Sequence, residues 1–262
     1  MDLGIRGKVA LVAASSKGLG RAVAEELAAE GTHLVICARG KETLEQTAES
    51  IRQKTGVKVV AVAADVSDSV DIARVVKAAF DQLGRVDILV TNSGGPPSGV
   101  FESFTLETWD AATRSLLKSA VELTRAVLPG MKERRWGRIL NVTSIAAKQP
   151  IEGLMLSNSL RAAVIGFART LANEVAPFGV TVNNLLPGYT RTDRVQELAR
   201  AAGGKDGAST DIVSKWEKEI PMGRLGEPRE FAALAAFLAS ERASYITGSS
   251  IAVDGGWIRS LL

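Results

Sequence analysis

The sequence contains very little cysteine and histidine. Among its 262 residues there is one cysteine, Cys37, and one histidine, His33. A single cysteine excludes an internal disulfide and a cysteine-based metal cluster, which indicates a reducing, intracellular setting. His33 precedes a predicted strand, far from the strand ends that carry ligands in a parallel sheet, so a Ser-His-Asp hydrolase is disfavoured. No cluster of histidine and acidic residues in the sequence suggests a metal site.

The sequence also lacks long hydrophobic runs and blocks of one charge. The longest helical apolar run, Phe231–Ala239, is too short to span a bilayer, and the opening residues MDLGIRGK lack the apolar region of a signal peptide. Basic and acidic residues are interleaved, as in Lys132-Glu133-Arg134-Arg135, and the net charge is +3. We therefore expect a cytoplasmic protein with a solvated surface that binds neither membranes nor nucleic acid.

Apolar segments alternate with helical patterns along the whole chain. Strands are predicted over 9–13, 34–38, 57–63, 86–90, 138–142, 181–185 and 250–253. Helices are predicted from 19 to the glycine at 31, and over 41–54, 68–83, 106–133, 152–176 and 228–238, with Ser67 as a candidate N-cap. This alternation predicts an α/β protein: one Rossmann-type domain over 1–262, with a doubly wound parallel sheet of about seven strands and helices on both faces. A polar stretch at about 189–220 breaks the rhythm and is the predicted substrate lid.

The stretch Val9–Gly31 combines a strand, a glycine-rich turn and a helix. Its sequence is VALVAASSKGLGRAVAEELAAEG, in which an apolar run is interrupted by Ser15–Gly20 before the helical period begins. This order directs backbone N–H groups and a positive helix end at one point, which suits a pyrophosphate. The alternative is a tight turn without a ligand, since glycine-rich strand–helix turns are common in α/β proteins.

This stretch resembles the cofactor loop of the short-chain dehydrogenase/reductase family. In this family the loop has the pattern T-G-x-x-x-G-x-G, and here Gly18 and Gly20 match the second and third glycines. Ala14 stands where the first glycine is expected. Because alanine lacks easy access to positive φ, we expect the loop to turn with negative φ at Ala14.

The resemblance continues through the loops that follow the later strands. It covers Asp65-Val66, the family's N-N-A-G as Thr91-Asn92-Ser93-Gly94, the P-G-x-x-x-T region Pro187–Thr192, and the C-terminal 246–248 and 253–256. The resemblance implies that Asp65 meets the adenine, although a helix-terminal acid is the alternative, and that Thr190 and Thr192 support the nicotinamide. The cofactor-binding residues it implies are Ala14, Ser16, Lys17, Gly18, Leu19, Gly20, Arg39, Asp65, Val66, Asn92, Ser93, Gly94, Arg161, Pro187, Gly188, Thr190 and Thr192.

Basic residues occupy the positions that distinguish NADP(H) from NAD(H). Arg39 follows the second predicted strand, where proteins that prefer NAD place an acid for the ribose 2′-hydroxyl. A guanidinium instead suits a 2′-phosphate, and Lys17 adds a second positive charge nearby. The sequence therefore predicts NADP(H) in preference to NAD(H). The alternative is that both residues are ordinary surface cations.

The catalytic positions depart from the family pattern. The family uses a Ser, a Tyr-x-x-x-Lys motif and an Asn on the preceding helix. Ser144 matches the Ser, but the motif reads Ser157-x-x-x-Arg161, and we assign the Asn position to Ser115. Hydride addition to a carbonyl leaves an alkoxide that needs a proton, which a phenol of pKa about 10 can supply. Serine is a far weaker acid and arginine is effectively always charged, so the standard proton relay is absent.

Several groups are candidates to replace the missing relay. Tyr189 follows Pro187-Gly188, close to the expected nicotinamide, and loop packing is the alternative for its ring. Lys148 lies on the loop after Ser144. Ser144 and Ser157 are candidates to hydrogen-bond a carbonyl oxygen, and a water held by Arg161 is a further proton source.

The sequence is compatible with two main functions. The first is an NADP(H)-dependent oxidoreductase with a non-standard proton donor, similar to 3-oxoacyl-acyl-carrier-protein reductases, acting on a small-molecule carbonyl or alcohol or an acyl thioester. The second is a catalytically silent NADP(H)-binding sensor or partner subunit. A lyase is more remote, because family-like dehalogenases keep the Tyr and lose the cofactor glycines. The resemblance also implies a homotetramer, or a homodimer, in which the helices 106–133 and 152–176 form one interface.

Overall fold

The computed structural model describes residues 2–203 and 209–261. It contains one seven-stranded sheet in the order β3-β2-β1-β4-β5-β6-β7, and every neighbouring pair is parallel. The strands are β1 Val9–Val12, β2 His33–Ala38, β3 Val59–Ala63, β4 Ile88–Thr91, β5 Gly137–Val142, β6 Val180–Pro187 and β7 Ser250–Val253. The predicted Rossmann-type α/β fold is therefore confirmed, and its strand boundaries differ from the prediction by a few residues at most.

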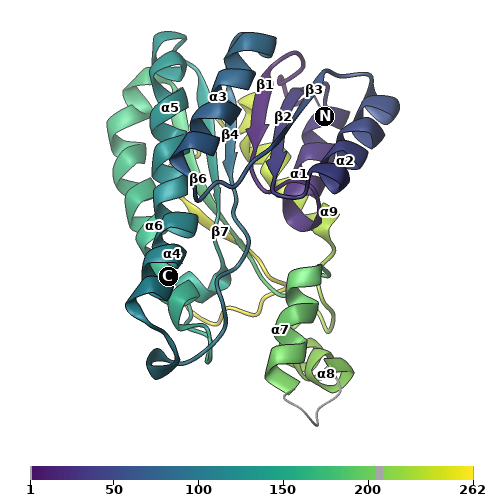
Figure 1. Ribbon diagram of the computed structural model, residues 1–262, viewed down its shortest axis with the longest axis vertical. Helices are drawn as coiled ribbons and strands as arrows, with labels where there is room; N and C mark the ends of the chain where they lie inside the picture. Colours follow the sequence, from purple (N-terminus) through teal and green to yellow (C-terminus); the bar gives the residue numbers. More distant parts are fainter. Residues whose placement is uncertain (1, 204–208, 262) are drawn as a thin grey trace.

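Helices cover both faces of the sheet (Figure 1). They are α1 Gly18–Ala29, α2 Lys41–Thr55, α3 Ser69–Leu83, α4 Leu106–Thr113, α5 Ser119–Glu133, α6 Met155–Val175, α7 Asp193–Gly203, α8 Ser209–Glu219 and α9 Pro228–Leu238. One buried cluster joins α1, α2 and α9 to the sheet, and a second joins α3, α5 and α6 to the opposite face. The sheet therefore lies between two layers of helices.

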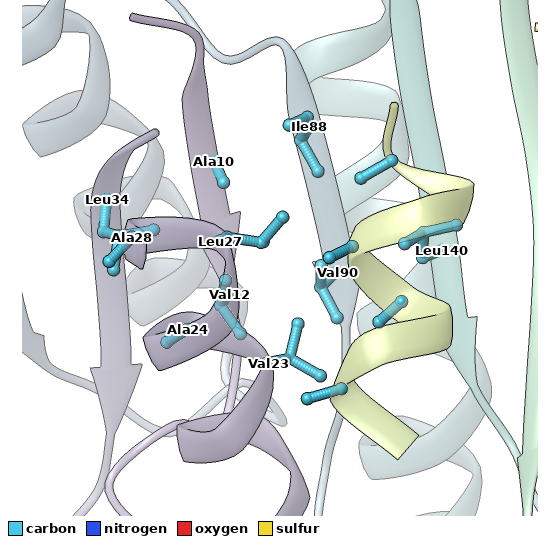
Figure 2. Close-up of a cluster of buried hydrophobic side chains, with 14 of the residues drawn as sticks. Ala10, Val12, Val23, Ala24, Leu27, Ala28, Leu34, Ile88, Val90 and Leu140 are labelled. Atoms are coloured by element: carbon cyan, nitrogen blue, oxygen red, sulfur yellow. The ribbon is translucent and has the colours of Figure 1, made fainter. Parts of the chain in front are cut away.

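Side-chain alternation along β1 divides the core between the two faces. Ala10 and Val12 belong to the cluster under α1, whereas Leu11 belongs to the cluster on the other face. This is the two-residue period of a strand that is buried on both sides. Figure 2 shows Val23 and Leu27 of α1 beside the sheet residues of the first cluster.

Two local expectations are corrected by the structure. Asp68, rather than Ser67, is the N-cap of α3, because its carboxylate accepts the N–H of Val70 at 2.7 Å while the Ser67 hydroxyl donates to Asp65. The helix predicted over 106–133 is interrupted by a π-helical turn at Arg114–Lys118. The stretch 189–220 includes the helices α7 and α8, and its residues 204–208 lie outside the described residues.

The strand order creates a switch point between β1 and β4. From β1 the chain builds the sheet outward through β2 and β3, and from β4 it builds in the opposite direction. Ligands of open α/β sheets bind at the carboxyl ends of the strands on either side of such a point. The loops after β1, β2, β4, β5 and β6 therefore define the candidate site.

Two features, a membrane-spanning helix and a metal site, are absent from residues 2–203 and 209–261. No helix there is long and apolar enough to cross a membrane. No group of three or more histidine, cysteine, aspartate or glutamate side chains in the same ranges is arranged to hold a metal ion.

Candidate active site

The glycine-rich loop is fixed to the two strands beside β1. Ala13 donates its N–H to Val90 of β4, and Ser15 donates its N–H to Cys37 of β2, each at 3.0 Å. The Ser15 hydroxyl donates to the Val12 carbonyl at 2.8 Å. Helix α1 then begins at Gly18, and its first turn carries no acidic residue. The positive end of α1 therefore faces the switch point without a compensating carboxylate on that turn.

Ala14 has a φ of +48°, so the expectation of a negative φ there is wrong. The hydrogen bonds of Ala13 and Ser15 hold the chain on both sides of this residue. The Ala14 carbonyl accepts from Asn92 Nδ2 at 3.3 Å. A left-handed backbone costs a residue with a Cβ about 1–2 kcal/mol, which these contacts offset. The loop thus keeps its turn although alanine occupies the position.

Gly20 allows α1 to approach this loop closely. A Cβ at Gly20 would lie 2.3 Å from the Ala14 carbonyl oxygen and 2.9 Å from Asn92 Nδ2. Both distances are shorter than real Cβ contacts permit, and the first partner is backbone. A side chain at Gly20 would therefore displace the loop or the helix.

The two cations predicted to bind a 2′-phosphate lie after β1 and β2. Lys17 Nζ pairs with Asp193 Oδ2 of α7 at 2.7 Å. Its hydrogen bond and charge interaction with that carboxylate raise the pKa of Lys17 above its usual value. Arg39 is exposed, and within the described part of the chain its guanidinium forms no hydrogen bond or ion pair.

The loop after β3 already uses one carboxylate oxygen of Asp65. Asp65 Oδ1 accepts the N–H of Ser67 at 2.9 Å and its hydroxyl at 2.8 Å. The side chain of Val66 is buried in the core. Asp65 therefore shapes this turn, and its Oδ2 forms no hydrogen bond with any described residue.

A small cavity lies between β4, β5 and the helices α5 and α6. It is lined by Thr91, Asn92, Ser93, Leu116, Ser119, Ala120, Val142, Arg161 and Val164. Arg161 donates to the Val142 carbonyl at 2.9 Å and to the Gly94 carbonyl at 3.4 Å. No described carboxylate lies within ion-pair distance of this guanidinium. Burial lowers the pKa of Arg161 to about 10, and repulsion from Arg194 adds to the shift.

Two predicted serines lie on the elements that position Arg161. Ser157 precedes Arg161 by one turn of α6, so both side chains lie on the same face of the helix. Ser157 is 7% exposed, and its hydroxyl forms no hydrogen bond with any described residue. Ser144 follows β5, and its Oγ accepts the N–H of Ala146 at 3.1 Å. Of the two hydroxyls, that of Ser157 is therefore the one without a hydrogen-bond partner among the described residues.

The predicted Ser115 is not among the residues that line the cavity, whereas Leu116 and Ser119 are. All three lie in or beside the π-helical turn Arg114–Lys118, and the Ser119 hydroxyl donates to the Ser115 carbonyl. A π-turn adds a residue to the helix and shifts which side chains face inward. The sequence pattern carries no signal for that turn, so Ser119 was missed.

Tyr189 packs in an aromatic cluster with Trp216 of α8 and Trp257. Its ring stacks on Trp216 with centroids 4.4 Å apart, and Trp257 meets it edge-on at 5.9 Å. Burial, with repulsion from Glu219, raises the pKa of Tyr189 to about 12. Both observations favour the packing alternative for this residue. Lys148 is exposed at the end of the short helical turn after Ser144.

The segment after β6 is anchored from both sides. Gly188 donates its N–H to Val253 at 3.0 Å, and a Cβ there would lie 2.7 Å from the Asp254 Cα. The hydroxyl of Thr190 donates to the Gly188 carbonyl, and that of Thr192 to the Thr190 carbonyl, each at 3.2 Å. Pro187, the last residue of β6, precedes these contacts. The predicted nicotinamide loop is therefore a series of short turns at the carboxyl end of β6.

Sequence reasoning missed Arg194, which joins α7 to the loop after β4. Its Nη2 donates to the Pro96 carbonyl at 2.6 Å. A Cβ at Gly95 would lie 2.3 Å from Arg194 Nε, so the guanidinium packs directly on that glycine. The partners are 98 residues apart in the chain, which is why no local motif points to this contact. The remaining predicted residues Ser16 and Leu19 support the loop: the Ser16 carbonyl accepts from Thr47, and Leu19 packs on the core.

Together, the sheet order and the glycine loop define a Rossmann-type dinucleotide-binding fold. Residues 13–258 match the family model described as enoyl-(acyl carrier protein) reductase. The 3-oxoacyl-acyl-carrier-protein reductase of Aquifex aeolicus is 35% identical over 98% of this chain and 99% of that protein. The corresponding Vibrio cholerae reductase is 38% identical over 97% of this chain and 98% of that protein.

A solved structure of L-sorbose reductase from Gluconobacter frateurii, complexed with NADPH and L-sorbose, is also similar. It is 36% identical, the match covers 100% of both chains, and the TM-score is 0.95. The chain belongs to the short-chain dehydrogenase/reductase family. These relatives support its assignment as a dehydrogenase/reductase.

Proposed function

We propose that this protein is an NADP(H)-dependent oxidoreductase that acts on a small-molecule carbonyl or alcohol, or on an acyl thioester. The approach of α1 to the glycine loop at Gly20 carries the proposal, because it supports a cradle of the kind that holds a pyrophosphate. The acid-free first turn of α1 and the unpaired oxygen of Asp65 fit the same ligand. The residues present therefore fit a pyridine dinucleotide, which supplies a hydride when bound.

The preference for NADP(H) over NAD(H) rests on charge. Arg39 lies after β2 without a carboxylate partner among the described residues, and Lys17 follows the neighbouring strand β1. A carboxylate at the position of Arg39 would favour the ribose hydroxyls of NAD instead. That the related L-sorbose reductase was solved with NADPH is consistent with this preference.

The catalytic proposal places Ser157 and Arg161 where the family has its Tyr and Lys. Arg161 would stabilise the negative charge that develops on the substrate oxygen, because its guanidinium has no carboxylate partner among the described residues. Ser144 and Ser157 would donate hydrogen bonds to the carbonyl oxygen. A water held by Arg161 would carry the proton, with Tyr189 as the second candidate and Ser115 as a supporting residue on the preceding helix.

The contacts of Arg161 also favour a second candidate function. The guanidinium already donates to two backbone carbonyls, so it has a structural role without any substrate. A catalytically silent NADP(H)-binding sensor or partner subunit would retain the cofactor loops and this contact. The two functions differ only in whether the protein converts a substrate.

A panel of carbonyl substrates separates the two functions. The purified protein is incubated with NADPH and ketoses, β-keto thioesters or simple ketones, and NADPH oxidation is followed by absorbance. The proposal expects oxidation with at least one class, reduced in Ser144→Ala and Ser157→Ala. NADPH binding with no oxidation across the panel would favour the sensor.

The assembly and the lid complete the proposal. We propose one cytoplasmic domain with a lid over about 189–220, assembled as a homotetramer or homodimer. Tyr245 and Leu261, near the C-terminus, and Leu106, at the start of α4, are exposed apolar side chains that favour an interface. Light scattering at micromolar concentration tests this assembly, and a monomer peak would contradict it.

A further inference from the structure

The ion pair between Lys17 and Asp193 joins the glycine loop to the first turn of α7. Lys17 Nζ lies 2.7 Å from Asp193 Oδ2, although the residues are 176 positions apart in the chain. Their side chains are 64% and 60% exposed, respectively. Exposed pairs of this kind contribute little to stability, about 0.2–1 kcal/mol. A stronger anion can therefore displace the carboxylate at small cost.

The start of α7 contacts two loops of the site. Thr192, just before α7, lies beside Gly18 of the glycine loop, where an added Cβ would meet the Thr192 methyl carbon at 3.6 Å. Arg194 donates to the carbonyl of Pro96, in the loop after β4, at 2.6 Å. The start of α7 thus spans from the glycine loop to the loop after β4, with Asp193 between these contacts.

A phosphate would offer Lys17 more negative charge than its present partner, Asp193, does. Asp193 offers one negative charge, and Glu197 on the same helix adds a weaker field at Lys17. A phosphate monoester carries close to two charges and three acceptor oxygens. Charge-assisted hydrogen bonds to such a group are stronger than those between exposed side chains.

We propose that Asp193 is a specificity-determining residue for the cofactor. It holds Lys17 until a 2′-phosphate takes its place, so that the first turn of α7 and the phosphate compete for one ammonium group. This inference rests on the proposed binding of NADP(H) at the glycine loop. Asp193 thereby reduces the preference of the site for NADPH over NADH. By linkage, bound NADPH weakens the ion pair that joins α7 to the glycine loop.

The variant Asp193→Asn tests the competition directly. Fluorescence titration with NADPH and with NADH gives the two Kd values at low salt and again at high salt. We expect Asp193→Asn to lower the Kd for NADPH roughly two- to fivefold and to leave that for NADH unchanged. High salt should shrink the gain, because both groups are exposed. In a Lys17→Gln background, the same substitution should lower the Kd for NADPH by a smaller factor.

Asp211→Asn is the matched control, because it removes an exposed carboxylate of α8 that forms no ion pair with any described residue. An unchanged Kd for NADPH in Asp193→Asn, an equal gain for NADH, or the same gain in the control would overturn the proposal. Asp193→Ser provides a second variant if the first unfolds in a thermal melt. Failure of the unmodified protein to bind either nucleotide would instead overturn the proposed function itself.

Discussion

The cofactor side and the catalytic side of this site depend on different parts of the chain, the first mainly on its backbone and the second on its side chains. On the cofactor side, backbone contacts fix the glycine loop at Ala14, and Gly20 serves this loop by carrying no side chain. On the catalytic side, the proposed chemistry depends on the side chains of Ser157 and Arg161. A fold therefore transfers the first kind of function between relatives more securely than the second.

Gly20→Ala should have the largest effect on cofactor binding, because it changes the backbone geometry of the cofactor side. The new Cβ would meet the Ala14 carbonyl oxygen at 2.3 Å, and overpacking of this kind costs about 1–3 kcal/mol. We expect NADPH affinity to fall about 10- to 100-fold in a fluorescence titration. Gly40→Ala is the control, since nothing lies within 4 Å of its added Cβ. Equal NADPH affinities in the two variants would contradict the proposal that the glycine loop and α1 hold the pyrophosphate.

Arg161→Met tests the catalytic side. Loss of a group that stabilises transition-state charge typically lowers kcat about 10²- to 10³-fold. We expect such a loss in NADPH oxidation, with a much smaller change in NADPH affinity. Arg125→Met removes an exposed guanidinium from α5 and should leave kcat unchanged. A full kcat in Arg161→Met would remove this residue from the chemistry.

The pH profile examines the same guanidinium without a substitution. Its lowered pKa of about 10 means that the charged form prevails below that pH and is lost above it. Activity that needs the charge should therefore persist through neutral pH and fall as the pH rises through about 10. A limb centred near neutrality in kcat/KM would assign the limiting proton transfer to another group.

Arg39→Ala should have a smaller effect, confined to one cofactor. Removal of a charge-assisted contact to the 2′-phosphate should raise the Kd for NADPH roughly tenfold and leave that for NADH unchanged. Lys58→Ala, an exposed cation just before β3 at the opposite ends of the strands, is the control. Equal losses for both nucleotides would show that Arg39 does not read the phosphate.

Tyr189→Phe should have the smallest effect. The substitution retains the ring that stacks on Trp216, and the raised pKa of Tyr189, about 12, makes its phenol a poor acid. We expect an unchanged kcat in NADPH oxidation and an unchanged melting temperature. A tenfold loss of kcat with an unaltered melt would instead identify Tyr189 as the proton donor.

Features that depend on local patterns were predictable from the sequence. Helix α9 and strand β7 have the predicted ends, and Gly84 ends α3 with a φ of +77°. The parallel sheet follows from the alternation of apolar strands with helices. These features depend on side-chain period and on glycine punctuation, which the sequence displays directly.

Features set by distant contacts were not predictable from the sequence. The φ of Ala14 is imposed by the hydrogen bonds that Ala13 and Ser15 donate to the carbonyls of Val90 and Cys37 on neighbouring strands. The π-turn before α5 shifts Ser119 rather than Ser115 into the cavity. Arg194 reaches the site from a helix within a stretch that lacked a clear period. Such contacts become visible only when the chain is folded.

A fluorescence titration of the purified, unmodified protein with NADPH and, in parallel, with NADH tests the central claim most directly. The account predicts saturable binding of both nucleotides, with the lower Kd for NADPH. Binding of neither would mean that the loop at Ala14 does not accept a dinucleotide, and it would contradict the proposed oxidoreductase.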